Sequence, residues 1–236
     1  MGEVSCEGRT TREINAEIKK QIQLGEKHIR VRDPGARHNL GVAILEPVTL
    51  QLEGSVGYYC AGLIDGPTFE IAGSAGWGLA ESMMSGQVVV RGSAGNGAAA
   101  AIRGGTVVIH GDAAARLGIS MKGGTVVVAG NCGYMAGFMA QKGTLIVCGD
   151  AGEAFADSMY QTVCYVGGKI AGLGTDTVLE IPSPDDAQSI DAVLGQFLDP
   201  EARKRLPAGG EFKKVVAGRK LWNFDKREWK TWQEAL

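Results

Sequence analysis

Aromatic residues make up only 6% of this 236-residue chain, and long uninterrupted apolar runs are missing. A membrane-spanning helix needs about 20 consecutive apolar residues, so the sequence predicts no such helix. Residues 1–24 also lack the apolar stretch of a secretory signal peptide, and we therefore expect a cytoplasmic protein. The net charge of −2 predicts no general attraction to nucleic acid or to an anionic membrane.

Residue types that bind metals or catalyse reactions are also scarce. The chain has 3 histidines and 5 cysteines, and no two cysteines form a Cys-x-x-Cys pair. We expect reduced, mostly buried thiols rather than disulfides or metal ligands. No thiol or hydroxyl stands out as a nucleophile that His28, His38 or His110 could activate as a base. The carboxylates are scattered, and no acid/base pair stands out among them. The sequence therefore predicts no catalytic residue, no bound cofactor and no metal on this chain.

Glycine is abundant instead, with 36 residues, and much of it recurs at a fixed spacing. Residues 49–181 divide into seven consecutive units of 19 residues without an insertion. Each unit opens with a short run of β-branched or apolar residues, such as Val126 to Val128. A glycine follows this run at the sixth position of every unit: Gly54, Gly73, Gly92, Gly111, Gly130, Gly149 and Gly168.

This repeat predicts the fold. A fixed period of about 20 residues is typical of a solenoid in which each repeat forms one coil. The apolar run and the glycine predict a strand and a tight turn, while the small residues that follow supply too little apolar area for an amphipathic helix. We therefore predict an all-β fold, a right-handed parallel β-helix of seven 19-residue coils, with a glycine ladder along one corner.

Segments on both sides of the repeats are expected to cover the open ends of the column. Residues 1–48 contain a helix that starts with a capping box of Thr10 and Glu13, followed by a strand. That helix can alternatively dock on a partner, and residues 1–9 are interpreted as a frayed or partner-bound arm. Residues 182–236 begin with the helix start Ser183-Pro184, and we expect this second helix to cover the last coil.

Two polar segments are candidates for interfaces. The first lies just before the first coil, where a loop can contact a partner or bind an anion. The second is the C-terminal tail from Glu211, in which basic and aromatic residues alternate. Such a tail suits docking on a partner or on the chain's own body, and nucleic-acid binding is the alternative. The candidate interface residues are Arg37, His38, Asn39, Arg219, Trp222 and Trp229.

The repeats resemble the Gly-x-Gly-x-Gly β-helix domain that forms the C-terminal part of the glutamate synthase large subunit. The resemblance covers residues 36–181 and rests on runs such as Gly-Ser-Ala-Gly-Trp-Gly from Gly73 and Gly-Ser-Ala-Gly-Asn-Gly from Gly92. The same domain occurs as a separate chain in split glutamate-synthase-like enzymes, including N-methylglutamate synthase. It also occurs in one of the subunits of formylmethanofuran dehydrogenase.

The resemblance implies a noncatalytic scaffold subunit in a hetero-oligomer. In the resembled enzymes, a class II amidotransferase-like subunit releases ammonia from glutamine. A glutamate-synthase-like subunit that carries FMN and an iron–sulphur cluster then uses it. This chain looks most similar to the separate subunit of N-methylglutamate synthase, which implies that the assembled enzyme converts methylamine and L-glutamate to N-methyl-L-glutamate and ammonia.

Four alternatives stay open at this point. Two of them are also subunits, one of an ammonia-transferring glutamate synthase and one of a formylmethanofuran-dehydrogenase-like complex. The third is an independent enzyme that uses a cleft on the β-helix. The fourth is a nucleic-acid-binding module that uses the basic tail.

Overall fold

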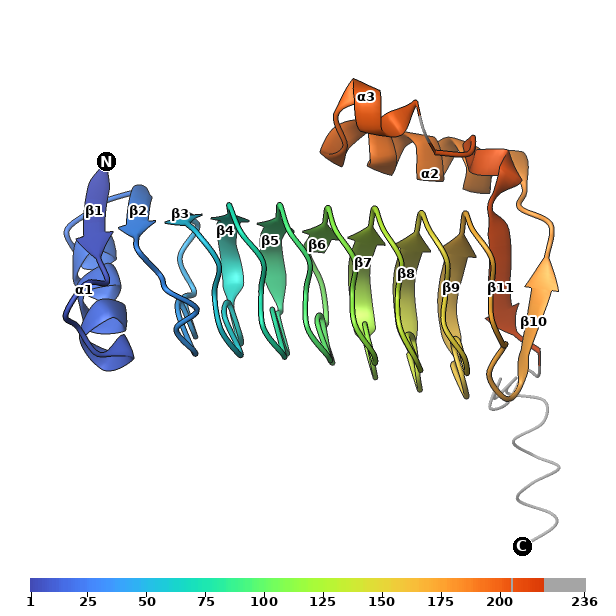
Figure 1. The fold of residues 1–236 in the computed structure, drawn as a ribbon, viewed down its shortest axis with the longest axis horizontal. Coiled ribbons are helices and arrows are strands. Elements are labelled where there is room, and N and C mark those ends of the chain that lie inside the picture. Colours follow the sequence, from blue (N-terminus) through green and yellow to red (C-terminus); the bar gives the residue numbers. More distant parts are fainter. Residues whose placement is uncertain (205, 219–236) are drawn as a thin grey trace, which may run out of the picture.

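The structure, a computed structural model, describes residues 1–204 and 206–218. In this part of the chain eleven strands lie side by side in one sheet, and together they form an elongated column (Figure 1). The spatial order is β1-β2-β3-β4-β5-β6-β7-β8-β9-β11-β10, so the strands follow the chain order until the last two. The predicted parallel β-helix is confirmed.

The N-terminal end of the column is closed by a helix. Its elements are β1 (Gly2–Ser5), α1 (Thr11–Gln23) and β2 (His28–Arg32). The predicted capping box is present: Thr10 accepts a hydrogen bond from the Glu13 N–H, and the Glu13 carboxylate accepts one from the Thr10 N–H. Ile14, Ile18 and Ile22 are buried in the same core as the first strands. The expectation of a frayed arm was wrong, because β1 pairs in parallel with β2.

The seven coils stack in an almost constant register. We number them from coil 1 (residues 49–67) to coil 7 (residues 163–181). Between neighbouring coils, equivalent strand residues are 19 positions apart, as in the pairing of Leu50 with Phe69 and of Phe69 with Val88. The strands of the coils are β3 (Thr49–Glu53), β4 (Asp65–Ile71), β5 (Ser85–Val90), β6 (Thr106–Ile109), β7 (Lys122–Val128), β8 (Lys142–Val147) and β9 (Gln161–Val166).

The glycine ladder is explained by the space between the coils. A Cβ atom on Gly111 would lie 2.9 Å from both the carbonyl carbon and the oxygen of Gly92, which is backbone and cannot move aside. Gly54 is the single member of the ladder with a left-handed φ, at 149°. Lack of room for a side chain, rather than backbone conformation, therefore requires glycine in the other six coils.

The second half of each coil forms what we call the turn face, made by the tenth to fifteenth residues. Here the eleventh, thirteenth and fifteenth residues of coils 1 to 6 have left-handed φ angles, and many of them are not glycine. In coil 3 the N–H of Ala99 donates to Leu79 of the coil before, and that of Ala101 donates to Ile119 of the coil after, both at 2.8 Å. These bonds between coils offset the strain of about 1–2 kcal/mol that each left-handed residue other than glycine carries.

The C-terminal end is closed by an antiparallel strand. The last elements are β10 (Thr177–Glu180), α2 (Pro184–Phe197), α3 (Pro200–Arg203), η1 (Gly209–Glu211) and β11 (Lys213–Ala217). Strand β11 inserts between β9 and β10 and pairs antiparallel with both. Phe212 and Val215 are buried. The beginning of the predicted docking tail is therefore part of the chain's own body.

Helix α2 has a different position from the predicted one. We expected it to cover the last coil, but it runs back along the side of the column from the C-terminal end (Figure 1). It packs on the outward third residue of coils 3 to 7, where coils 1 and 2 carry polar Gln51 and Glu70. The buried contacts join Val89, Val108, Val127, Ile146 and Tyr165 to Ile190, Leu194 and Leu198.

Candidate functional site

The loop before the first coil is held by the chain's own groups. The Nη1 of Arg37 donates to the carbonyl oxygens of Asp33 and Pro34, at 3.2 and 3.3 Å. The Nδ1 of His38 accepts a hydrogen bond from the Tyr58 N–H at 2.8 Å. The carbonyl of Asn39 accepts one from the Asn15 side chain at 2.7 Å. The structure thus brings Arg37, His38 and Asn39 together beside coil 1, and their role in an interface stays a prediction.

The imidazole of His38 starts a stack of exposed rings. Its ring stacks on Tyr58 with centroids 4.4 Å apart, and Tyr58 stacks on Trp77 of coil 2 at 5.2 Å. Trp77 is 51% exposed, and Tyr59 next to the stack is 46% exposed. The sequence analysis singled out His38 but not its aromatic neighbours, although aromatics are scarce in this chain and Tyr58, Tyr59 and Trp77 all fall on coils 1 and 2.

The turn face is hollowed beside this stack. A hollow of about 560 Å³ extends over coils 1 to 5, and Asn96 and Ile119 are among its lining residues. A second hollow of about 240 Å³ adjoins coil 1 and shares Tyr59 and Glu81 with the first. We call the larger one the turn-face hollow. Its principal lining residues are Tyr59, Trp77, Glu81, Gly97, Ala100, Ala115, Arg116 and Tyr134.

The other candidate interface residues, Arg219, Trp222 and Trp229, lie outside the described residues. The Gly218 N–H donates to the carbonyl of Asp176 at 2.7 Å, next to β10. The assignment of Arg219, Trp222 and Trp229 as interface residues stays a prediction.

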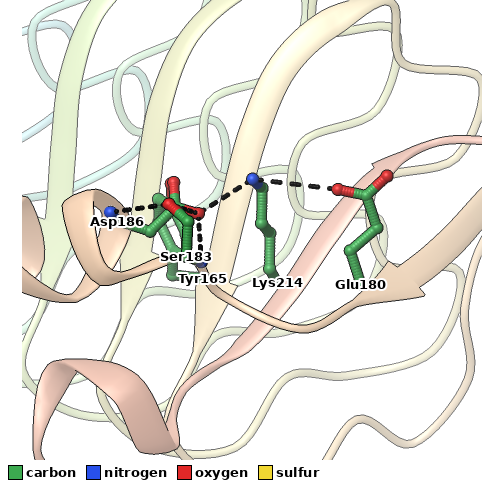
Figure 2. Close-up of polar contacts among 5 residues, drawn as sticks. All are labelled: Tyr165, Glu180, Ser183, Asp186 and Lys214. Atoms are coloured by element: carbon green, nitrogen blue, oxygen red, sulfur yellow. Dashed lines mark hydrogen bonds and ion pairs between the residues drawn. The ribbon is translucent and has the colours of Figure 1, made fainter.

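A polar cluster joins the last coil to α2 and β11. The Tyr165 hydroxyl donates to Asp186 Oδ1, and the Lys214 ammonium lies 2.9 Å from Asp186 Oδ2 (Figure 2). Ser183 donates to the same carboxylate through its N–H and its hydroxyl, and Glu180 lies 3.7 Å from Lys214. Burial acts to raise the pKa of Asp186, but the hydrogen bonds from Tyr165, Lys214 and Ser183 outweigh it and hold the pKa well below 3.8.

The same cluster keeps the tyrosine neutral. Burial, and then the hydrogen bond to Asp186, raises the pKa of Tyr165 well above its ordinary 10.0. An ionised carboxylate that accepts from a neutral phenol and a lysine is a stable arrangement at neutral pH. The cluster therefore acts as a structural clamp between β9, α2 and β11.

The surroundings of His110 and of the cysteines are those of structural residues. Nη1 of Arg91 lies 3.0 Å from Nε2 of His110, and burial followed by the charge of Arg91 lowers the pKa of this histidine. The five cysteines are buried and free, as the sequence predicted. Within residues 1–204 and 206–218, no three His, Cys, Asp or Glu side chains converge as metal ligands would. None of the helices described here is both long and apolar enough to span a bilayer.

One ladder of side-chain hydrogen bonds was not predicted from the sequence. The seventh residue of coils 1 to 6 uses its side-chain oxygen to accept a hydrogen bond from the backbone of the next coil. The Asn131 N–H, for example, donates to Asp112 Oδ1 at 2.7 Å. The signal was present, because only Ser, Asp and Asn occur at this position: Ser55, Ser74, Ser93, Asp112, Asn131 and Asp150.

Comparison with known proteins identifies the family. The GXGXG motif family matches residues 36–180, which is more than half of the chain and covers almost all of the stacked coils. The chain belongs to this family. It is also similar to Protein GlxC of Rhizobium meliloti (strain 1021), with 44% identity over 57 residues. That similarity covers 23% of this chain and 25% of GlxC, so the chain matches about a quarter of the length of that relative.

Proposed function

We propose that this chain is a noncatalytic scaffold subunit of a multi-subunit, glutamate-synthase-like enzyme. The observation that carries the proposal is membership of the GXGXG family over the column itself, at residues 36–180. The resemblance of the repeats associates this column with glutamate synthase and with related split enzymes. The partial similarity to GlxC supports the same group and extends over 57 residues.

The physical properties of the column suit a scaffold. Successive coils are joined by strand pairing, by the isolated bridges from Val56 to Ile170 and by the hydrogen bonds of the turn face. A column whose coils are bonded in this way is already ordered before assembly, so it loses little conformational entropy when partners dock. Such a column presents a large preorganised surface.

The proposed partners follow from the resemblance. One is a class II amidotransferase-like subunit, and the other is a glutamate-synthase-like subunit that carries FMN and an iron–sulphur cluster. We propose N-methylglutamate synthase as the particular enzyme, in which methylamine and L-glutamate give N-methyl-L-glutamate and ammonia. The scaffold would contribute the relative placement of the two active sites rather than a reacting group.

Purification through a tag on this chain, from its own cells, tests the proposal. We expect mass spectrometry to identify both partner subunits, and absorption of the eluate to show flavin and iron–sulphur cluster. Turnover with methylamine, compared with ammonia, identifies the amine. Molybdenum or tungsten in the eluate would favour the formylmethanofuran-dehydrogenase-like complex instead. A colourless solitary chain would contradict the proposal.

A further inference from the structure

Several large apolar side chains are exposed on the turn face. Helix α2 packs against the outward strand residues of coils 3 to 7, and the two ends are closed by α1 and β11. On the turn face, by contrast, Tyr59, Trp77 and Tyr134 are 46%, 51% and 50% exposed. Only 6% of the residues in this chain are aromatic, yet these three aromatic side chains line one hollow. Exposed aromatic clusters of this kind mark interaction surfaces.

The shape of the hollow suits an inserted side chain. Trp77 lies on coil 2 and Tyr134 on coil 5, so about 14 Å of column separates their coils. Between them the lining residues are small, among them Gly97, Ala100 and Ala115. The result is a shallow cavity with an aromatic residue at each end, of about 560 Å³. An aromatic or large aliphatic side chain from a docking polypeptide would bury its surface there.

The charges beside the hollow specify what should flank that side chain. Glu81 is half-buried and Arg116 is exposed, and both line the hollow. In the part of the chain that the structure describes, neither side chain forms an ion pair or a side-chain hydrogen bond. They lie two coils apart, at about 10 Å along the column. A complementary partner needs a basic group toward coil 2 and an acidic group toward coil 4.

We propose that the turn-face hollow receives an apolar anchor residue from a partner subunit, flanked by a Lys or Arg opposite Glu81 and by a carboxylate opposite Arg116. The proposal rests on the proposed function and names the surface by which the scaffold binds. A second copy of this chain fits less well. Two identical concave surfaces placed face to face would enclose a void, and protein interfaces exclude voids of that size.

Two substitutions in the full-length chain test the surface. Arg116→Glu reverses the unpaired charge, and Ala100→Trp fills the hollow. Each is expected to reduce recovery of the partner subunit that occupies the hollow by roughly tenfold or more, with the melting temperature of the isolated chain unchanged. The matched controls are Lys142→Glu and Ala171→Trp, which make the same changes at exposed residues outside the hollow and should recover the partner normally.

A cross-link identifies what occupies the hollow. The native cysteines are buried, so Ala115→Cys provides one accessible thiol inside the hollow for a maleimide-linked benzophenone. Irradiation of the assembled complex should attach it to a partner peptide with an apolar residue between a basic and an acidic one. A peptide from a second copy of this chain would overturn the proposal.

The outcomes separate the two proposals. Recovery of both partners by the wild-type chain and equally by Arg116→Glu and Ala100→Trp overturns the docking surface but leaves the scaffold function standing. Failure of the wild-type chain to recover any amidotransferase-like or flavin-containing subunit overturns both.

Discussion

The hydroxyl of Tyr165 in coil 7 donates to Asp186 Oδ1 at the start of α2 across 2.5 Å, and this bond fastens the lateral helix to the column. Tyr165→Phe removes the bond while Lys214 and Ser183 continue to satisfy the carboxylate. Because Tyr165 is 7% exposed, we expect a loss of about 1–2 kcal/mol in unfolding free energy. Urea denaturation measures it, and an unchanged midpoint would contradict the role of the bond.

The clamp predicts how stability depends on pH. Since the pKa of Asp186 lies below 3.8 in the folded chain, its contribution is present above that pH and is lost as the pH falls further. Since the pKa of Tyr165 is raised above 10.0, the neutral phenol's contribution is present below that pH and is lost as the pH rises.

Asp186→Asn should be less stable at neutral pH and should lose less stability than the wild type on acidification below pH 3.8. Parallel curves from urea titrations at each pH would contradict this.

Two glycine-to-alanine substitutions should have opposite effects. Gly111→Ala forces a Cβ to 2.9 Å from the Gly92 backbone, and we expect a cost of roughly 2–4 kcal/mol because neither backbone can move independently. Gly195→Ala lies in α2 with no atom within 4 Å of the new Cβ, and should stabilise the chain by about 0.5–1 kcal/mol. Thermal unfolding of both variants checks the signs.

Two truncations test whether β11 closes the column. Ending the chain after Gly210 removes β11 and the buried Phe212 and Val215, and leaves β9 with an unpaired edge. We expect this variant to aggregate or to unfold at much lower temperature. A chain that ends after Gly218 keeps β11 and should unfold at a higher temperature than the one that ends after Gly210. Equal stability of the two truncated chains would show that β11 does not close the column.

The cysteines should be unreactive in the folded chain. Burial raises the pKa of Cys60 and of Cys132 to about 12. Burial also raises the pKa of Cys148 to about 12, although the charge of Arg203 acts to lower it. Since the thiolate is the reactive form, a thiol reagent at pH 8 should label almost none of the 5 cysteines until the chain is denatured. Rapid labelling of the native chain would indicate an opening of the coils.

The stacked coils could be predicted because each coil repeats one physical requirement. Gly111 has no room for a side chain because the backbone of Gly92 lies directly beside it. The same contact recurs in six coils. The capping box of Thr10 and Glu13 is likewise a local pattern that the chain satisfies within four residues. Patterns that are local or that repeat in every coil can be recognised in the sequence without knowledge of the three-dimensional structure.

The lateral position of α2 has a signal in the sequence that the prediction did not use. The outward third residue changes from Glu70 in coil 2 to Val89 in coil 3, and it stays apolar up to Tyr165. An apolar stripe on the outside of a solenoid requires a cover, so this change marks where α2 packs. The insertion of β11 has no such signal, since its pairing with β9 joins segments almost fifty residues apart.

The turn-face hollow could not be predicted from local propensity. Ala99 and Ala101 have left-handed φ angles of 58° and 54°, which alanine rarely adopts. Hydrogen bonds to the coils before and after hold them there. The concave shape near Ala100 therefore depends on the assembled stack, whereas the sequence of one coil contains no signal for it.

Deletion of this chain in its own cells tests the central claim most directly. A tag on the proposed flavin-containing partner recovers its complex with and without this chain present, and quantitative mass spectrometry measures the proposed amidotransferase-like partner in each eluate. We predict that the two subunits separate when this chain is absent, and that returning the chain restores their association. Undiminished recovery of the amidotransferase-like subunit without this chain would contradict its role as the scaffold between them.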